Sequence, residues 1–237
     1  MTQPLITIGI TVFNAEETIL RSVFSALSQS WRNFEIVVVD DFSNDESYVR
    51  VDQIRQKYGQ IRLYRNSKNC GVAVSRNLIL DKAKGEFVIF FDDDDESLPD
   101  RVEKQYLRIV NYEKQFADGA LVICHTARRI IYPNKKERIE STKGVNKNRR
   151  APYGLAVAKR ILLGTPLKDA YGSCPTCCQM ARLSTYRKLG GFDPLFRRGE
   201  DTDFNIRLAI AGGHFVGLDE PLVVQIMTKT SEKSLQD

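Results

Sequence analysis

Short apolar runs alternate with amphipathic or polar segments along the first half of the chain. Four of these runs, most of them rich in β-branched and aromatic residues, are predicted to be strands: 5–13, 34–40, 61–64 and 87–91. The segments between them have helical spacing or helix-ending signals: 17–30, 45–59 and 71–85. This order predicts an α/β fold with a Rossmann-like, mostly parallel sheet that helices cover on both faces.

Several helix ends have signals of their own. Asn14 is placed to cap the first helix, with Glu17 at the third helical position as in a capping box. The third helix is expected to stop at Gly85. Beyond Pro99 the pattern predicts helices over 100–115, 184–190 and 202–212, strands over 120–126 and 178–183, and Ser184 as a cap.

Composition narrows the class of protein. The chain has 237 residues, 42% hydrophobic and 27% charged, which is typical of a folded domain. No apolar run approaches the roughly 20 residues that span a bilayer, and the amino terminus lacks a basic region before an apolar core. Five cysteines are an odd number, which favours reduced thiols over a disulfide framework. We therefore expect a cytoplasmic protein.

The net charge of +5 is concentrated in one segment. Between Thr126 and Arg160 eleven Lys and Arg stand against only Glu137 and Glu140. We expect 126–165 to be a long loop or a partly helical insertion. It is either a solvated surface or an electrostatic contact with acceptor phosphates or anionic lipid. Nucleic acid is not expected, because no aromatic residues are interleaved with the basic ones.

Four consecutive aspartates, Asp92–Asp95, follow the fourth strand. Two carboxylates about 4 Å apart repel each other by roughly 4 kcal/mol at an effective dielectric near 20. If the chain stays extended, Asp92 and Asp94 leave on one side and Asp93 and Asp95 on the other. One pair can then share a cation. The alternative is a solvated acidic turn before a helix that begins near Pro99 and Asp100.

Other unusual polar residues follow the predicted strands at the same edge of the sheet. They are Thr11, Phe13, Asn14, Asp40, Asp41, Arg76 and Asn77. Open α/β sheets bind ligands at this carboxyl edge. Asp41 can accept a hydrogen bond from a base imide while Phe13 covers the ring, which indicates a nucleotide. No Walker A or GxGxxG motif is present, so Mg²⁺ or Mn²⁺ held by Asp92 and Asp94 is expected to neutralise the phosphates.

A second acidic pair, Glu200 and Asp201, precedes the last predicted helix. Asp201 is either a helix N-cap or a general base that deprotonates an acceptor hydroxyl.

Together these segments resemble family 2 glycosyltransferases of the GT-A fold. The resemblance rests on TVFNAEETILRSVFSALSQSW, VVVDDFSND, NCGVAVSRNLILDKAKGEFVIFFDDDD and GGFDPLFRRGEDTDFNIRL, in the order of the family, up to about Glu220. It implies inverting transfer from a nucleoside diphosphate sugar to a glycan or a lipid-linked acceptor. Residues 1–98 would be the nucleotide-sugar-binding half. Residues 99–237 would be the half that binds the acceptor and supplies the base.

The resemblance also implies roles for single residues. Thr11, Phe13 and Asp41 would hold the nucleoside, often uridine, and Arg76 would lie near the diphosphate. Asp94 would be the direct ligand of Mn²⁺ or Mg²⁺, with Asp92 beside it. Asp201 would be the base, paired with Glu200. Three further residues are expected in the nucleotide-sugar site: Asn14, Glu16 and Asp93.

Two departures refine the expected activity. Phe13 stands where the family frequently has tyrosine, which keeps the stacking ring but loses a hydroxyl. The Q-x-x-R-W motif of processive synthases is missing, because QMARL lies before the acidic pair and lacks the tryptophan. A single addition is expected, at the inner membrane face if the basic segment contacts lipid.

Alternatives remain open. A sugar nucleotidyltransferase should carry a glycine-rich basic loop after the first strand, and TVFNAEE is not one. A non-catalytic nucleotide-sugar-binding domain of a larger synthase is the other rival. The cysteines of 174–178 have too few partners for a structural zinc site, so they are expected to line an acceptor pocket or pack in the core.

Overall fold

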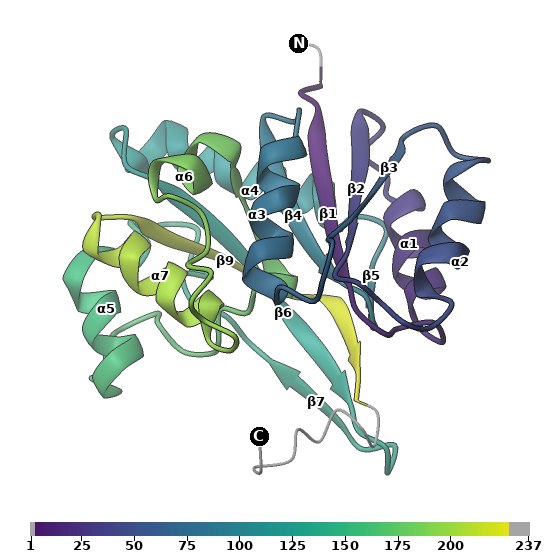
Figure 1. Cartoon of the computed structure of the whole chain (residues 1–237). Coiled ribbons are helices and arrows are strands. Elements are labelled where there is room, and N and C mark those ends of the chain that lie inside the picture. Colours follow the sequence, from purple (N-terminus) through teal and green to yellow (C-terminus); the bar gives the residue numbers. More distant parts are fainter. Residues whose placement is uncertain (1–2, 228–237) are drawn as a thin grey trace.

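The four strands predicted in the first half lie side by side in the computed structural model, which describes residues 3–227 (Figure 1). They run parallel in the order β3-β2-β1-β4. Their bounds are β1 Ile6–Val12, β2 Phe34–Asp40, β3 Ile61–Arg65 and β4 Phe87–Asp92. The helices between them are α1 Ile19–Leu27, α2 Ser47–Arg55 and α3 Val72–Lys82. The Rossmann-like half of the prediction is confirmed.

The second half of the chain continues the same sheet with mixed strand directions. Next to β4 the order is β8-β6-β9-β5, and β7 pairs with β6. Strand β8 is antiparallel to both β4 and β6, whereas β9 is parallel to β6. The bounds are β5 Asp95–Ser97, β6 Val122–Ile131, β7 Glu137–Glu140, β8 Gln179–Arg182 and β9 His214–Ile226.

Helices cover both faces of this sheet. The remaining helices are α4 Arg101–Tyr112, α5 Gly154–Leu163, α6 Leu183–Lys188 and α7 Glu200–Ile210. Single turns lie at Glu113–Ala117 (π) and Thr176–Cys178 (3₁₀). Side chains of β4 alternate between two cores, with Phe87 and Phe91 packed under α1, α2 and α4. Val88 and Phe90 pack under α3, α5, α6 and α7.

The expected helix caps at Asn14 and Ser184 are wrong. Helix α1 begins after Thr18, and Asn14 instead adopts a left-handed conformation with φ 50°. Its side-chain oxygen accepts a hydrogen bond from the backbone N–H of Asn44, which ties together the loops after β1 and β2. Ser184 lies inside α6, whose cap is Arg182.

Gly85 does not end the third helix, since α3 stops at Lys82. It is required for a different reason. A Cβ at Gly85 would lie 2.5 Å from the backbone nitrogen of Thr7, so only glycine lets the chain enter β4 this close to β1.

The basic segment is more ordered than expected. Its first part prolongs β6 and returns as β7, so a β-hairpin replaces the predicted loop, and α5 supplies the helical part.

Strand β9, the longest of the described strands, was not predicted. Its sequence HFVGLDEPLVVQI contains Gly217 and Pro221, which indicate a turn when read locally. The register with β6 shifts at Thr126 and Ala127, and this irregularity accommodates the interrupted sequence.

We predict that His125 makes the free energy of unfolding pH-dependent. This side chain of β6 is buried and has no hydrogen-bond partner among residues 3–227, and burial, followed by Lys143 and Arg101, lowers its pKa to about 3. Histidine in an unfolded chain titrates near 6.5. The contribution of His125 to the free energy of unfolding is therefore complete above that pH, and it is lost as the pH falls toward 3, at up to about 1.4 kcal/mol per pH unit. Urea denaturation at several pH values between about 7 and 5 gives the free energy of unfolding as a function of pH. This free energy should change less with pH in His125→Asn than in the unchanged protein. Equal changes with pH in the two proteins would contradict this.

Candidate active site

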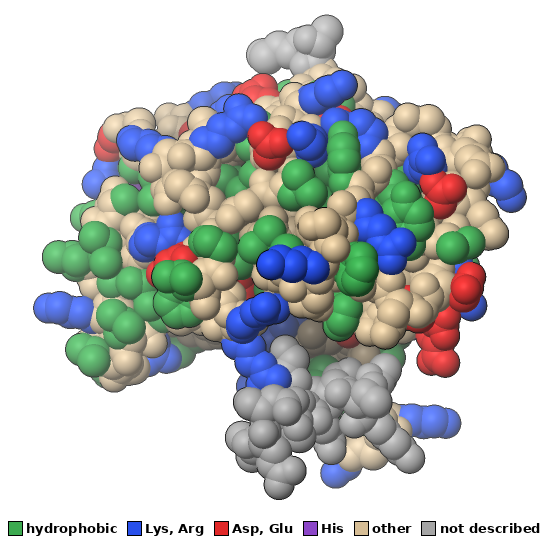
Figure 2. All heavy atoms as spheres, viewed as in Figure 1, with side chains coloured by type: hydrophobic (Ala, Val, Ile, Leu, Met, Phe, Trp, Pro, Cys, Tyr) green, Lys and Arg blue, Asp and Glu red, His purple; other side chains and the backbone are tan. Residues whose placement is uncertain are grey.

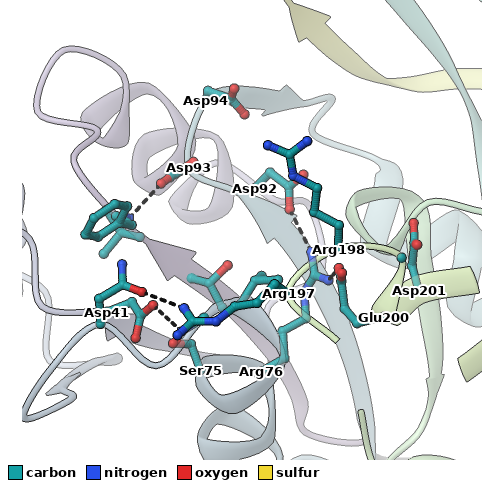
Figure 3. A pocket seen from close by; sticks show the side chains of 17 residues that line it. Asp41, Ser75, Arg76, Asp92, Asp93, Asp94, Arg197, Arg198, Glu200 and Asp201 are labelled. Atoms are coloured by element: carbon teal, nitrogen blue, oxygen red, sulfur yellow. Dashed lines mark hydrogen bonds and ion pairs between the residues drawn. The ribbon is translucent and has the colours of Figure 1, made fainter. Parts of the chain in front are cut away.

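A cavity of about 490 Å³ opens at the carboxyl ends of β1, β2 and β4 (Figure 3). We call it the first cavity. Residues from both halves of the chain line it: Thr11, Val12, Phe13, Asp41, Asn69, Gly71, Val72, Ser75, Arg76, Asp92, Asp93, Asp94, Arg197, Arg198, Gly199, Glu200 and Asp201. Most residues that the sequence singled out are therefore brought together at one edge of the sheet.

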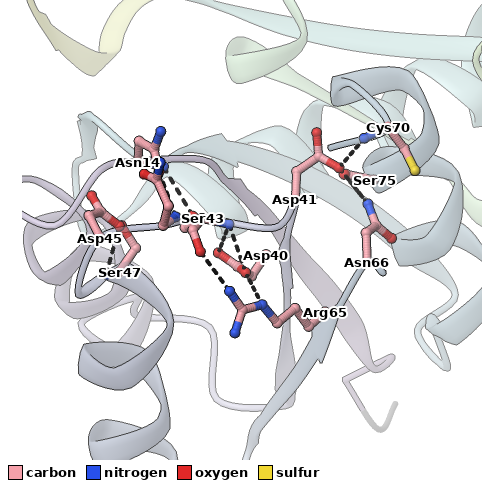
Figure 4. Close-up of polar contacts among 11 residues, drawn as sticks. Asn14, Asp40, Asp41, Ser43, Asp45, Ser47, Arg65, Asn66, Cys70 and Ser75 are labelled. Carbon is pink, nitrogen blue, oxygen red and sulfur yellow. Dashed lines mark hydrogen bonds and ion pairs between the residues drawn. The ribbon is translucent and has the colours of Figure 1, made fainter. Parts of the chain in front are cut away.

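Asp41 organises one wall of the first cavity. One carboxylate oxygen accepts hydrogen bonds from the side-chain amide of Asn66 at 2.7 Å and from the backbone N–H of Cys70 at 2.9 Å (Figure 4). The other accepts from the backbone N–H of Gly71 at 2.8 Å. A carboxylate has about four acceptor positions, so roughly one remains for a ligand. Phe13 is 46% exposed, which leaves its ring available for stacking.

Two predicted edge residues support the cavity from behind. Buried Asp40 forms an ion pair with Arg65 at 3.0 Å and accepts from the backbone of Ser43 (Figure 4). Asn77 makes two hydrogen bonds with the backbone of Phe192, at 2.7 and 2.8 Å. Both residues fix loops and are absent from the lining.

Asn14 and Glu16 lie in the loop after β1 and do not line the first cavity. The side chain of Glu16 accepts a hydrogen bond from the backbone of Glu46, and Asn14 bonds Asn44. Their contacts stabilise the neighbouring loop after β2.

The acidic run does not continue as an extended strand. Strand β4 ends at Asp92, the next two residues form a turn, and β5 begins at Asp95, so the expected alternation of side chains is wrong. Asp93 accepts a hydrogen bond from the backbone N–H of Phe13 at 3.1 Å. Burial, together with Asp94 and Asp92, raises the pKa of Asp93 to about 8.

Asp95 is the most deeply buried of the four aspartates. It is 3% exposed, and neither carboxylate oxygen has a hydrogen-bond partner of normal length among the described residues. Potential ligand atoms of Asp92, Asp95 and Cys177 all lie within 4.8 Å of one another. Burial, then repulsion by Asp92 and Asp94, raises the pKa of Asp95.

These properties fit a divalent cation at the aspartates. Crowded carboxylates with raised pKa values, one of them without an N–H or O–H donor among the described residues, are stabilised by a positive ion. Mg²⁺ and Mn²⁺ prefer oxygen ligands, so the carboxylates suit them and the thiol of Cys177 does not.

Arg76 connects the two acidic groups of the first cavity. Arg76 is 6% exposed. Its guanidinium forms ion pairs with Glu200 of α7 and, at 3.5 Å, with Asp92 of β4. It also lies over the ring of Phe192 at 5.5 Å. The carboxylate of Glu200 is therefore occupied by its ion pair with Arg76, and this pair fixes the position of the start of α7.

Asp201 is not the helix cap, since Gly199 occupies that position with φ 76°. One carboxylate oxygen of Asp201 accepts from the backbone N–H of Thr202 at 2.7 Å. In Figure 3 Asp201 lies beyond Glu200, on the side away from Asp41. Its second oxygen is left to accept a proton from a ligand.

A second cavity, of about 530 Å³, also includes Asp201 in its lining. Its other lining residues are Arg128, Lys143, Arg160, Ile161, Gly164, Gly172, Ser173, Cys174, Pro175, Thr202 and Asn205. Cys177 and Cys178 are buried against Val223, so the expected packing in the core is confirmed for these two cysteines, whereas Cys174 lines the second cavity.

Sequence reasoning missed several residues of the first cavity. Arg197 and Arg198 line it, and Arg197 donates to the side chain of Asn69 at 3.0 Å (Figure 3). Their position directly before the acidic pair, in FRRGED, was an available signal. Asn69 and Ser75 had none, because the loop conformation brings Asn69 to the cavity and the packing of α3 brings Ser75 there.

Comparison with known proteins identifies the family. Residues 7–178 match the family described as "Glycosyl transferase family 2". The chain therefore belongs to glycosyl transferase family 2. The putative glycosyltransferase EpsE of Bacillus subtilis is 30% identical over 92% of this chain and 72% of its own length. An uncharacterized glycosyltransferase of Haemophilus influenzae is 38% identical over 52% of this chain and 50% of its own.

A further relative and a solved structure extend the comparison. The Escherichia coli protein WfaP, named a UDP-Glc:alpha-D-GlcNAc-diphosphoundecaprenol beta-1,3-glucosyltransferase, is 34% identical over 47% of this chain and 43% of its own length. Staphylococcus aureus TarS 1-349, solved in complex with UDP-GlcNAc, superposes with a TM-score of 0.70 at 20% identity. That match covers 94% of this chain and 59% of TarS 1-349, and it confirms the expected GT-A fold.

We predict that Glu200→Ala lowers the free energy of unfolding by about 3 to 5 kcal/mol, because it leaves the buried guanidinium of Arg76 without its closer partner. Chemical denaturation measures the change. Glu137→Ala is the matched control, since its pair with Arg129 is exposed and 3.8 Å long, and it should change stability by less than about 0.5 kcal/mol. Similar losses in the two variants would contradict the role given to Glu200.

Proposed function

We propose that this chain transfers one sugar, with inversion, from a UDP sugar to a hydroxyl of a glycan or lipid-linked acceptor, as in the assembly of bacterial surface polysaccharides. The observation that carries the proposal is the first cavity itself. Its lining contains Asp41, the three aspartates Asp92–Asp94 at the end of β4, and Asp201 of α7. Family membership and the names of the relatives support the same activity.

The donor would lie along the carboxyl edge of the sheet. Asp41 has about one acceptor position left for the imide N–H of uracil, and the exposed ring of Phe13 can cover the base. Thr11 lines the same wall. Arg197 and Arg198 point into the cavity, where they can bind the diphosphate of the donor (Figure 3).

Asp92 and Asp94 would hold Mn²⁺ or Mg²⁺, with Asp94 as the direct ligand that the family resemblance implies. A bound divalent ion stabilises the charge that develops on a diphosphate leaving group. The two ion pairs of Arg76 hold the carboxylates of Asp92 and Glu200 in position.

Asp201 would act as the general base. Its second carboxylate oxygen takes the proton of the acceptor hydroxyl. The hydroxyl oxygen then forms the bond to the anomeric carbon as the bond to the diphosphate on the opposite side breaks. One displacement without a covalent intermediate inverts the configuration at that carbon.

We include a peripheral position at the cytoplasmic face of the membrane in this proposal, and α5 supports it. Leu155, Leu162 and Leu163 are 62%, 62% and 75% exposed, and their spacing places them on one face of the helix with Lys159. Figure 2 shows apolar side chains at the lower left, over α5, beside a basic one. An apolar face with basic neighbours suits an anionic lipid surface. No described helix has the length and apolarity to cross a bilayer.

The donor chemistry is tested by ligand-induced thermal shifts and donor hydrolysis with UDP, GDP and dTDP sugars, with and without Mn²⁺. We expect stabilisation by UDP sugars that requires the metal, and slow metal-dependent hydrolysis. Asp94→Ala should abolish both. Asp201→Asn should keep the thermal shift and lower the rate of transfer about 10²- to 10⁴-fold.

These variants also separate the rival functions. A non-catalytic binding domain would show the thermal shift without hydrolysis, and a nucleotidyltransferase would release pyrophosphate from a sugar phosphate and UTP. The absence of any metal-dependent response to all donors would contradict the proposed function.

We predict that Leu155, Leu162 and Leu163 changed together to serine weaken binding to vesicles of anionic lipid by at least about tenfold, because three exposed apolar side chains are lost. Vesicle co-sedimentation measures this. Leu195→Ser is the control, since Leu195 is 87% exposed but belongs to the loop before α7. If both variants bind like the unchanged protein, α5 does not contact the membrane.

A further inference from the structure

The second cavity touches the proposed reaction centre, because Asp201 lines it as well as the first cavity. The first cavity carries the residues assigned to the donor. A molecule in the second cavity would therefore lie next to Asp201 as well. This is where the acceptor hydroxyl has to arrive.

Asn205 lines the second cavity, and its amide has one acceptor that no described residue uses. Its side-chain nitrogen donates to the backbone carbonyls of Cys174 at 2.9 Å and Asp201 at 2.8 Å, which fixes the orientation of the amide. The amide oxygen is buried and has no hydrogen-bond partner among residues 3–227. A buried carbonyl oxygen without a donor is costly, so a ligand hydroxyl at this position would be stabilised.

Two cations in the wall lack a carboxylate partner among the described residues. Lys143 is 6% exposed and donates to the carbonyl of Gly172, and Arg160 donates to the carbonyls of Gly164 and Ala170. Arg128, by contrast, is paired with Glu140 at 2.6 Å.

Cys174 does not balance the charge of Lys143. Burial raises the pKa of its thiol to about 11, so the sulfur stays neutral at ordinary pH. The wall of the second cavity therefore carries two positive charges that ligand oxygens can neutralise.

We propose that the second cavity is the acceptor subsite and that it selects a sugar phosphate, with the phosphate bound by Lys143 and Arg160. The sugar hydroxyl would lie between the amide oxygen of Asn205 and the free carboxylate oxygen of Asp201. This assignment rests on the proposed function, and it adds the chemical class of the acceptor. It also explains the basic segment 126–165, which supplies all three cations of the wall.

The test is titration calorimetry of the full chain with saturating UDP and Mn²⁺, so that the first cavity is filled. Glucose 1-phosphate and methyl glucoside are the probes. We expect glucose 1-phosphate to bind at least about tenfold more tightly, because a phosphate gains charge-assisted hydrogen bonds that a methyl group cannot make. Lys143→Gln and Arg160→Gln should each remove most of that preference.

Arg138→Gln and Lys147→Gln are matched controls, since both residues are exposed members of the same basic segment and lie outside the lining. Both should retain the preference. Inorganic phosphate alone should bind more weakly than glucose 1-phosphate. It can contact Lys143 and Arg160, but it has no sugar hydroxyl to bond Asn205 at the same time. Unchanged thermal stability of Arg160→Gln shows that its loss of binding is local.

Three results would overturn the assignment. They are equal binding of the two glucose probes, equal binding of inorganic phosphate and glucose 1-phosphate, or equal losses in the control and cavity variants. In each case UDP still binds, and the proposed function stands. If UDP itself fails to bind, the proposed function is wrong and the acceptor assignment falls with it.

Discussion

The ion pairs of Arg76 are the contact on which the arrangement of the candidate active site depends. Arg76 lies in α3, Asp92 ends β4, and Glu200 begins α7, so one buried guanidinium joins the two halves of the chain. A buried charge must be paired, and this requirement fixes α7 against the edge of the sheet. Asp201, the next residue along the helix, is positioned as a consequence.

The acidic run adds a second constraint. Four carboxylates within four residues are held at the end of β4 by a turn and by the return of β5 into the sheet. Burial and mutual repulsion raise the pKa of Asp93 and of Asp95, because the ionised carboxylates are destabilised next to one another. The divalent ion included in the proposed function would compensate this repulsion.

The second half of the sheet converts a basic segment into part of a cavity. Strand β6 pairs with β8, β9 and β7, and it carries Arg128 to the second cavity, while α5 packs on α7 and brings Arg160. The opposite face of α5 exposes leucines. One helix thus contributes to the proposed acceptor subsite and to the proposed membrane contact, an arrangement that would suit an acceptor held at a lipid surface.

The sequence alone determined the parallel half of the sheet and the composition of its carboxyl edge. Short apolar runs rich in β-branched and aromatic residues are local signals, and so are the polar residues that end them. Thr11, Phe13, Asp41, Arg76 and Asp92–Asp94 were found in this way, and the structure brings them into one cavity. Only the tertiary structure decided which of the residues singled out in the sequence line the first cavity. Asn14, Glu16, Asp40 and Asn77 turned to support loops instead, because their hydrogen-bond partners come from distant segments. Strand β9, the hairpin of β6 and β7, and the amide oxygen of Asn205, which has no partner among the described residues, were also decided by the tertiary structure alone. Strand pairing and burial depend on segments that are distant in the sequence, so no local pattern predicts them.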